Sequence, residues 1–462
     1  MQWQQLLNSE RPRPSTSPVD HRIDFEKDYD RSIFSTPVKR LQDKAQVFPL
    51  DPCDAVRTRL THSMEVSCTA RGLGIAVGKW LVKEEIITAE DSRAIEAILA
   101  TCGLIHDLGN PPFGHSGEDA IQYWFETRFP GDKLGKQLEN SPQLINDFRK
   151  FEGNAQSLRL VGKLQVLADA HGLNLTYGTL SASCKYTAPS DKANSEAEDY
   201  SKRKPGYFAS EGSLVDKIRE KTGSGDARNP LTFLVEAADD IVYSVADVED
   251  GIKKGILKWA ELEKLLKEYV DGSCQELGQV FGRKESILRA GRFEVPSGLA
   301  EDVHGAAFRT AAIGVLVESA TKNFQDRYQS IMKGEYKEDL LTRNGQLHPL
   351  INALKKIGKE RIYCTPENLK LEVMGRDVIC DLMDKFWEGA EKFPAKGRPK
   401  TKSFAGKLGA LLSSNYAQVF QQSLEEGELP ETYRRFQLVT DYVCGMTDSF
   451  AKRLHAELLN GI

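Results

Sequence analysis

Residues 104–118 read LIHDLGNPPFGHSGE, in which an apolar helical segment runs into a link rich in glycine and proline. Glycine and proline do not continue a helix, so the pattern predicts that the helix ends at this link. His106 and Asp107 stand at the end of the helix, and His115 and Glu118 follow the link. So many titratable side chains in one short stretch indicate a chemical site.

Two further candidate ligands lie in predicted helices elsewhere in the chain. His62 falls in RTRLTHSMEV, and Asp239 falls in VEAADDIVYSV among apolar residues that recur at helical spacing. A carboxylate within an apolar stripe is unfavourable unless it is paired or bound to a metal. Asp239, Tyr243 and Asp247 follow one another at four-residue intervals and therefore share one helix face. A lone histidine is usually structural, but this succession on apolar helices indicates a shared site.

Two imidazoles and two carboxylates form a suitable ligand set for a divalent cation. Mn²⁺ or Mg²⁺ is favoured and Fe²⁺, Co²⁺, Ni²⁺ and Zn²⁺ are compatible, whereas Ca²⁺ fits less well. A cation held by four protein ligands would keep positions for water and a phosphate oxygen. Such a cation lowers the pKa of bound water and polarises a phosphoryl group.

Composition limits the class of protein. The 462 residues have a hydrophobic share of 40%, a charged share of 28% and a net charge of −5. These values are ordinary for a soluble globular protein and argue against a wholly basic nucleic-acid binder. No apolar run is long enough for a membrane span and no signal-peptide core is seen, so a cytoplasmic protein is expected. Helical periodicity runs from Val38 through most of the chain, which predicts a mainly α fold.

Four motifs together resemble those of a known family. RTRLTHSMEV, GLIHDLGNPPFGHSGE, FEGNAQSLR and EAADDIVYSVADVEDG occur in this order. They resemble the bacterial deoxyguanosinetriphosphate triphosphohydrolases of the HD-domain phosphohydrolase superfamily and, more distantly, the animal HD-domain dNTP triphosphohydrolase. The motifs cover residues 30–255, and the C-terminal half resembles the family only in its helical character. The resemblance implies an HD-domain helical core, a helical C-terminal region and few short strands.

The resemblance also implies an activity, which is metal-dependent hydrolysis of dGTP, or of another dNTP, to the deoxynucleoside and inorganic triphosphate. One alternative is an HD phosphohydrolase that acts on another nucleotide. Another is a nucleotide-sensing or single-stranded-DNA-binding regulator with a vestigial site, which only the basic loop FPAKGRPKTKS at 393–403 supports. The expected partners are a dNTP substrate and further copies of the chain in a homo-oligomer, a hexamer among the candidates. Single-stranded DNA is a candidate regulator.

Family positions transfer to this chain residue by residue. The implied metal ligands are His62, His106, Asp107 and Asp239, and the implied catalytic pair is His115 and Glu118. Asp239 is preferred to Asp240, because only that register aligns the family's tyrosine and second aspartate with this chain. The implied substrate contacts are Gln46, Arg59, Asn154, Lys185, Tyr186, Lys204, Tyr243 and Asp247. His115 would activate water or protonate the leaving sugar oxygen, and the sequence leaves both roles open.

The phosphate end of the site is expected to be basic. By the resemblance, Arg59 binds phosphate, and Lys185 and Tyr186 stand before a long polar loop near 187–206 that we interpret as a lid. Lys204 lies near the end of this loop, and a solvated surface lysine is an equal alternative for it.

The sugar end is expected to select deoxyribose. Gln46 matches the glutamine that contacts the 3′-hydroxyl, and Val47 would pack where a ribose 2′-hydroxyl would lie. Such an apolar wall excludes ribonucleotides, because it leaves a hydroxyl without a partner. Asn154 and Gln156 in FEGNAQ are expected to contribute amides to the pocket.

The chain is expected to divide into three parts. Residues 1–30 would form a polar, flexible N-terminal arm, and residues 31–255 the HD core with its lid-like loop. Residues 256–462 would form a helical C-terminal region that completes the pocket and supplies oligomer interfaces.

Overall fold

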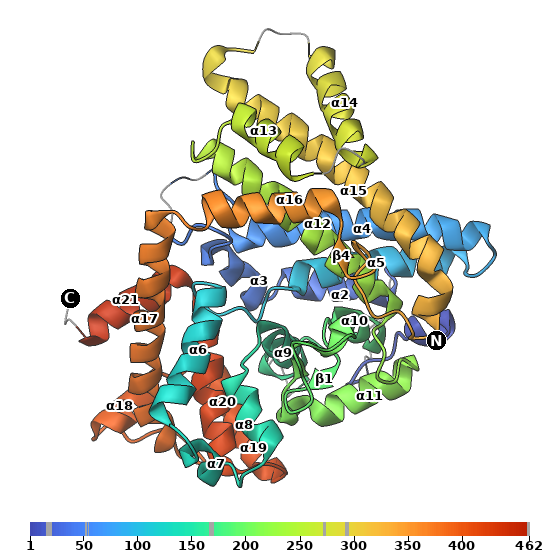
Figure 1. Ribbon diagram of the computed structural model, residues 1–462. Coiled ribbons are helices and arrows are strands. Elements are labelled where there is room, and N and C mark those ends of the chain that lie inside the picture. The colour runs from blue at the N-terminus through green and yellow to red at the C-terminus, as the bar shows by residue number, and fades with distance from the viewer. Residues whose placement is uncertain are drawn as a thin grey trace.

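The computed structural model describes residues 1–14, 21–50, 53, 55–165, 171–270, 274–291 and 295–459. It is built mainly of helices (Figure 1), which confirms the predicted mainly α class. Two short strand pairs accompany them in the described residues: β1 (Ala188–Pro189) runs parallel to β2 (Pro205–Tyr207), and β3 (Thr342–Arg343) runs antiparallel to β4 (Gln346–Leu347). No helix among the described residues is both long and apolar enough to cross a bilayer.

Three helices cross the centre of the molecule in Figure 1 and carry most of the motifs: α4 (Arg59–Lys83), α5 (Ala89–Ile105) and α12 (Pro230–Lys253). Polar side chains cap the N-termini of α4 and α5. The Thr58 hydroxyl accepts from the Thr61 N–H at the start of α4, and Thr88 forms a capping box at the start of α5. The backbones of α4 and α5 approach closely at Gly103, where a Cβ would lie 2.7 Å from Ser67 Cα. This close packing brings the start of α4 beside the end of α5.

The other helices surround this centre. They are α1 (Trp3–Leu6), α2 (Asp24–Ile33), α3 (Thr36–Arg40), α6 (His115–Arg128), α7 (Lys133–Gln137), α8 (Pro142–Arg149), α9 (Gly153–Arg159), α10 (Tyr177–Ser183), α11 (Gly212–Thr222), α13 (Trp259–Tyr269), α14 (Gln275–Ala290), α15 (Ala300–Met332), α16 (Pro349–Ile357), α17 (Pro366–Glu391), α18 (Phe404–Leu411), α19 (Ser414–Glu426), α20 (Glu431–Cys444) and α21 (Asp448–Leu459). The basic loop at 393–403 lies between α17 and α18.

Among the described residues, two clusters of buried apolar side chains hold the helices together. One joins α4, α5 and α12 to α15 and α16, and includes Leu73 and Phe324. The other joins α6, α8 and α9 to α17 and α20, and includes Phe125 and Phe386. Each cluster contains residues from both sides of position 255. The two predicted regions therefore do not have separate hydrophobic cores.

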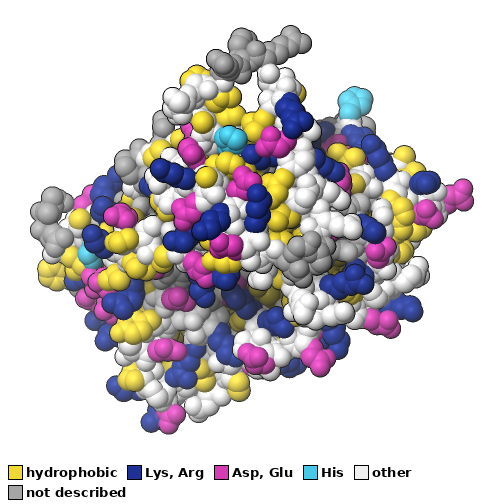
Figure 2. Space-filling model, turned by 45° about the horizontal axis from the view of Figure 1, so that its top comes forward, with side chains coloured by type: hydrophobic (Ala, Val, Ile, Leu, Met, Phe, Trp, Pro, Cys, Tyr) yellow, Lys and Arg dark blue, Asp and Glu magenta, His cyan; other side chains and the backbone are white. Residues whose placement is uncertain are grey.

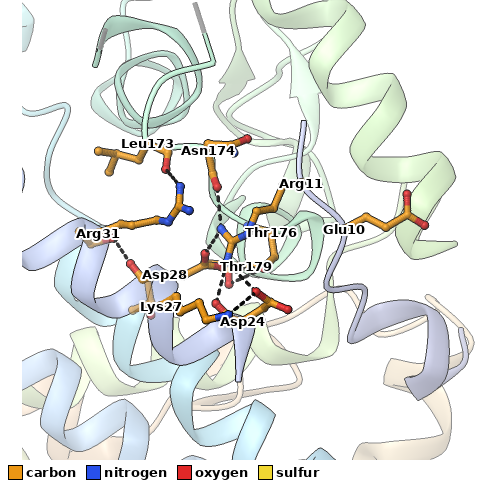
Figure 3. A network of polar contacts seen from close by, with 12 residues as sticks. Glu10, Arg11, Asp24, Lys27, Asp28, Arg31, Leu173, Asn174, Thr176 and Thr179 are labelled. Carbon is orange, nitrogen blue, oxygen red and sulfur yellow. Dashed lines mark hydrogen bonds and ion pairs between the residues drawn. The ribbon is translucent and has the colours of Figure 1, made fainter. Parts of the chain in front are cut away.

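The N-terminal segment differs from the predicted flexible arm. Leu6 is fully buried, and Trp3 Nε1 donates to Tyr328 Oη at 2.9 Å. Arg11 pairs with Asp28 of α2, whose second oxygen accepts from the Thr176 N–H and hydroxyl before α10 (Figure 3). The expectation of a polar arm is wrong for residues 1–14, because their few apolar side chains and one arginine find buried partners.

The long polar segment 187–206 is ordered and braced. Thr187 N–H donates to Ser201 O at 2.8 Å, and Tyr200 N–H donates to Lys337 O at 2.9 Å. The segment is therefore fixed to the C-terminal half of the chain as well as to itself. On the face shown in Figure 2, basic and acidic side chains are interspersed over the described part of the surface.

Candidate active site

A cavity of about 450 Å³ opens where α4, α5, α6, α9, α12 and α17 meet. Of the sequence-predicted site residues, it is lined by Gln46, Arg59, His62, His106, Asp107, His115, Glu118, Asn154, Lys185, Tyr186, Lys204, Asp239 and Tyr243. Of the residues predicted to contribute to the pocket, Asp247 and Gln156 do not line it. Of the loop interpreted as a lid, Lys204 alone reaches the cavity, because the bracing described above holds residues 187–203 away from it.

The four predicted metal ligands converge from three helices. His62 lies in the first turn of α4, His106 and Asp107 follow α5, and Asp239 lies in α12. His62 Nε2 is 3.2 Å from Asp239 Oδ1. One ligand atom from each of His62, His106 and Asp107 lies within 4.8 Å of the others. Asp240 instead pairs with Lys355 of α16 at 2.7 Å.

The surroundings of His106 fit a metal site. Its Nδ1 is 2.8 Å from the carbonyl oxygen of Gly103, so that nitrogen carries a proton and Nε2 is the nitrogen that a metal would bind. The buried Nε2 has no hydrogen-bond partner among the described residues, and it lies 3.5 Å from both Asp107 Oδ2 and Asp239 Oδ1. An unpartnered imidazole nitrogen that faces two carboxylates is a donor set for a divalent cation.

The carboxylates also control the charge of this site. Burial disfavours the charged form of His106, but Asp107 and Asp239 outweigh it and raise the pKa of this imidazole to about 9. Burial likewise opposes ionisation of Asp107 and Asp239, yet His106 holds the pKa of each carboxyl well below its usual range. A metal that binds here must therefore replace the proton on His106.

His115 and Glu118 form a pair in the first turn of α6. His115 Nδ1 is 3.0 Å from Glu118 Oε2, while the other oxygen of Glu118 accepts from the Gly153 N–H at 2.7 Å. The hydrogen bond that the imidazole donates to Glu118 raises the pKa of His115. The imidazole side chain is 85% exposed, so its Nε2 can reach a bound molecule.

Each of the three predicted phosphate-binding cations already has a carboxylate partner. Arg59 pairs with Asp107. Lys185 Nζ lies 3.6 Å from Glu236 Oε1, and Lys204 Nζ lies 2.9 Å from Glu152 Oε2. Glu152 and Glu236 line the same cavity. Each side chain predicted to bind phosphate is thus held by a carboxylate.

The sugar end is fixed by a backbone contact. Arg59 N–H donates to Lys44 O at 2.9 Å, which holds the strand-like stretch around Gln46 and Val47 against the start of α4. The helical periodicity predicted from Val38 therefore stops short of these residues. Both side chains line the cavity, as the predicted sugar contacts require.

Two predicted contacts lie elsewhere. Asp247 is buried behind the cavity wall, and its Oδ2 accepts from the Tyr363 hydroxyl at 2.6 Å. Gln156 is buried and donates to Asp441 of α20 at 3.0 Å. Partners from the C-terminal half thus hold both side chains outside the cavity lining, and the expected substrate contacts of Asp247 and Gln156 stay predictions.

Several lining residues were missed in the sequence. Asn110 donates to Asp107 Oδ1 at 2.8 Å, and Glu152 holds Lys204. Asn110 lies in the motif GLIHDLGNPPFGHSGE and Glu152 lies in FEGNAQSLR, so membership of these motifs could have identified both residues. Tyr363, Asn368 and Glu372 come from the C-terminal half, where no motif marks them.

Comparisons with known proteins agree with this geometry. The HD domain family matches residues 59–161, which include the His-Asp pair and the His115–Glu118 pair. A deoxyguanosinetriphosphate triphosphohydrolase-like protein of Listeria monocytogenes is 37% identical over the whole of both chains. A protein of the same name from Synechocystis is 33% identical over 99% of each chain. A deoxyguanosinetriphosphate triphosphohydrolase of Klebsiella pneumoniae is 31% identical over 97% of this chain and 96% of its own.

The chain belongs to the deoxyguanosinetriphosphate triphosphohydrolase family. This confirms the resemblance stated from the motifs and extends it over the C-terminal half. In this member of the family, the HD domain supplies the first three predicted ligands, and α12 supplies Asp239 from outside the matched segment.

Proposed function

We propose that this chain hydrolyses dGTP, or another dNTP, to the deoxynucleoside and inorganic triphosphate. The observation that carries the proposal is the convergence of His62, His106, Asp107 and Asp239 beside the His115–Glu118 pair in one cavity. The names of the relatives, which span the full chain, support the substrate class.

In the proposed reaction, water attacks the α-phosphorus, the bond from phosphorus to the 5′-oxygen breaks, and the whole triphosphate leaves the nucleoside. The water loses a proton and the 5′-oxygen gains one. A divalent cation bound by the predicted ligands would supply Lewis-acid polarisation of the phosphoryl group, and Mn²⁺ or Mg²⁺ suits the two imidazoles and two carboxylates.

The protein groups have separate roles in this proposal. Glu118 orients the imidazole of His115 and favours its protonated form, which supports proton donation from Nε2 to the leaving 5′-oxygen. Arg59, Lys185 and Lys204 would bind the phosphates, and Val47 would exclude the ribose 2′-hydroxyl.

Product analysis tests the proposal. Purified protein is incubated with each dNTP and with GTP in the presence of Mn²⁺ or Mg²⁺, and the products are separated. We expect inorganic triphosphate from at least one dNTP, little product from GTP, and a loss of kcat of about 100-fold or more in His115→Ala. Release of pyrophosphate or orthophosphate would instead assign the chain another phosphohydrolase reaction.

A further inference from the structure

Glu152 is an unusual residue for a pocket that is proposed to bind a polyphosphate. It lies at the start of α9 and lines the cavity, and its side chain is only 7% exposed. A carboxylate beside a bound anion is repulsive, and burial in a medium of low dielectric strengthens that repulsion. Unlike Asp107, Glu152 is not a predicted metal ligand, so a metal does not account for its charge.

The carboxylate of Glu152 has two sets of partners. Its Oε2 holds the ammonium of Lys204 at 2.9 Å, and Lys204 is 47% exposed. Its Oε1 accepts from the side-chain amide of Asn154 at 2.7 Å and from the Asn154 N–H at 3.5 Å. If Lys204 leaves, Glu152 therefore keeps hydrogen bonds from its own turn and does not become an orphaned charge.

The turn that carries Glu152 is fixed to the catalytic pair. The next residue, Gly153, donates its N–H to Glu118 Oε1, and a Cβ at this glycine would lie 2.6 Å from the same oxygen. A Cβ there would also lie 2.3 Å from Asn110 Oδ1. The backbone of this turn cannot move without disturbing Glu118, so an exchange of partners must be made by the side chain of Lys204.

The parallel pair of strands β1 and β2 positions Lys204 at the cavity. Ala188 of β1 pairs with Pro205 of β2, so the residues that precede each strand lie at the same edge. Lys185 and Tyr186 precede β1, and Lys204 directly precedes β2. All three line the cavity. The backbone of Lys204 is thus held in place, while its flexible side chain can reach either Glu152 or a bound anion.

We propose that Glu152 is a positioning residue for Lys204, which holds the lysine at the cavity wall in the empty protein and releases it to the polyphosphate of the bound nucleotide. The proposal rests on the proposed function only for the identity of the anion. Glu152 thereby makes binding depend on the charge of the ligand, because an anion must compete with a carboxylate for Lys204.

Binding of inorganic triphosphate to the full-length protein tests this proposal. Calorimetry in EDTA compares wild type, Glu152→Gln, Lys204→Met and the double variant. We expect E152Q to bind triphosphate about fivefold more tightly, because glutamine still accepts from Asn154 but no longer holds the ammonium. We expect K204M to bind more weakly than wild type, and E152Q to have no effect in the K204M background.

Glu372→Gln is the matched control, because Glu372 lines the same cavity and no described residue forms an ion pair with it. A general loss of negative charge would act equally with and without Lys204, and E372Q shows the size of that effect. The proposal is overturned if E152Q tightens binding equally in K204M, or if it weakens binding.

A second arm does not depend on the folding of E152Q. If K204M alone binds triphosphate as tightly as wild type, Lys204 is not the residue that is released and the proposal is also overturned. The dNTP product assay remains separate. Coupling between Glu152 and Lys204 without turnover would contradict the proposed function alone, and turnover without coupling would contradict this inference alone.

Discussion

His106 Nε2 lies 3.5 Å from Asp239 Oδ1, although α5 and α12 bring these residues from distant parts of the chain. Asp107 Oδ2 lies at the same distance from the same nitrogen. One imidazole nitrogen thus faces two carboxylates, and a divalent cation at this place would be bound by all three residues.

Replacing the carboxylate of Asp239 should weaken metal binding strongly. We expect Asp239→Asn to weaken Mn²⁺ affinity by more than about 100-fold, because loss of a direct ligand costs more than loss of a residue that only orients one. Calorimetric titration with Mn²⁺ measures the change. Asp240→Asn is the matched control, since Asp240 pairs with Lys355 and should leave the affinity nearly unchanged. The reverse result would assign the ligand to the neighbouring aspartate.

Metal affinity should rise with pH up to about 9. Asp107 and Asp239 outweigh the effect of burial and raise the pKa of His106 to about 9, so the metal-free protein holds a proton there at neutral pH. Each unit of pH below this value should weaken the apparent Mn²⁺ affinity by about tenfold, because the metal must displace that proton. Titrations at several pH values measure the slope, and an affinity independent of pH would contradict this account.

The Glu118 carboxylate should set the pH range of catalysis. Its hydrogen bond raises the pKa of His115, so Glu118→Gln should lower that pKa. If His115 acts as an acid, the alkaline limb of the kcat profile moves to lower pH. If it acts as a base, the acidic limb does so instead, so the profile separates the two roles left open by the sequence. A profile with both limbs unmoved would contradict any role for this pair in proton transfer.

Ionisation of Asp247 should destabilise the folded protein progressively as pH rises from about 4 to about 8. Burial raises its pKa to about 8, and its Oδ1 has no hydrogen-bond partner among the described residues. The folded chain therefore holds a proton that an unfolded aspartate loses near pH 4, and the free energy of unfolding falls as pH rises from about 4 to about 8. Asp247→Asn removes this titration, so the melting temperature of the variant should rise relative to that of wild type as pH increases across this range. A constant difference between the two proteins would show that Asp247 is already ionised.

The sequence predicted the parts of the site that local strings encode. His62, His106, Asp107, His115 and Glu118 lie in helical ends and links whose residue types carry the chemistry, and Asp239 follows from the register of one helix. The mainly α fold followed from periodicity for the same reason. The structure brings these residues together, and their roles stay predictions.

Contacts between distant segments could not be predicted. Nothing near Asp247 signals that Tyr363 approaches from the C-terminal half, or that Gln156 meets Asp441. The burial of Leu6 likewise depends on helices far along the chain. The choice of metal, the oligomer and regulation by single-stranded DNA stay predictions, because no side chain described above decides them.

Hydrolysis of dGTP in water enriched with oxygen-18, with Mn²⁺ present, tests the central claim most directly. Mass spectrometry of the products locates both the bond that breaks and the atom that water attacks. Attack at the α-phosphorus predicts labelled inorganic triphosphate and unlabelled deoxyguanosine. Label in the deoxyguanosine, or release of pyrophosphate or orthophosphate in place of triphosphate, would contradict the account.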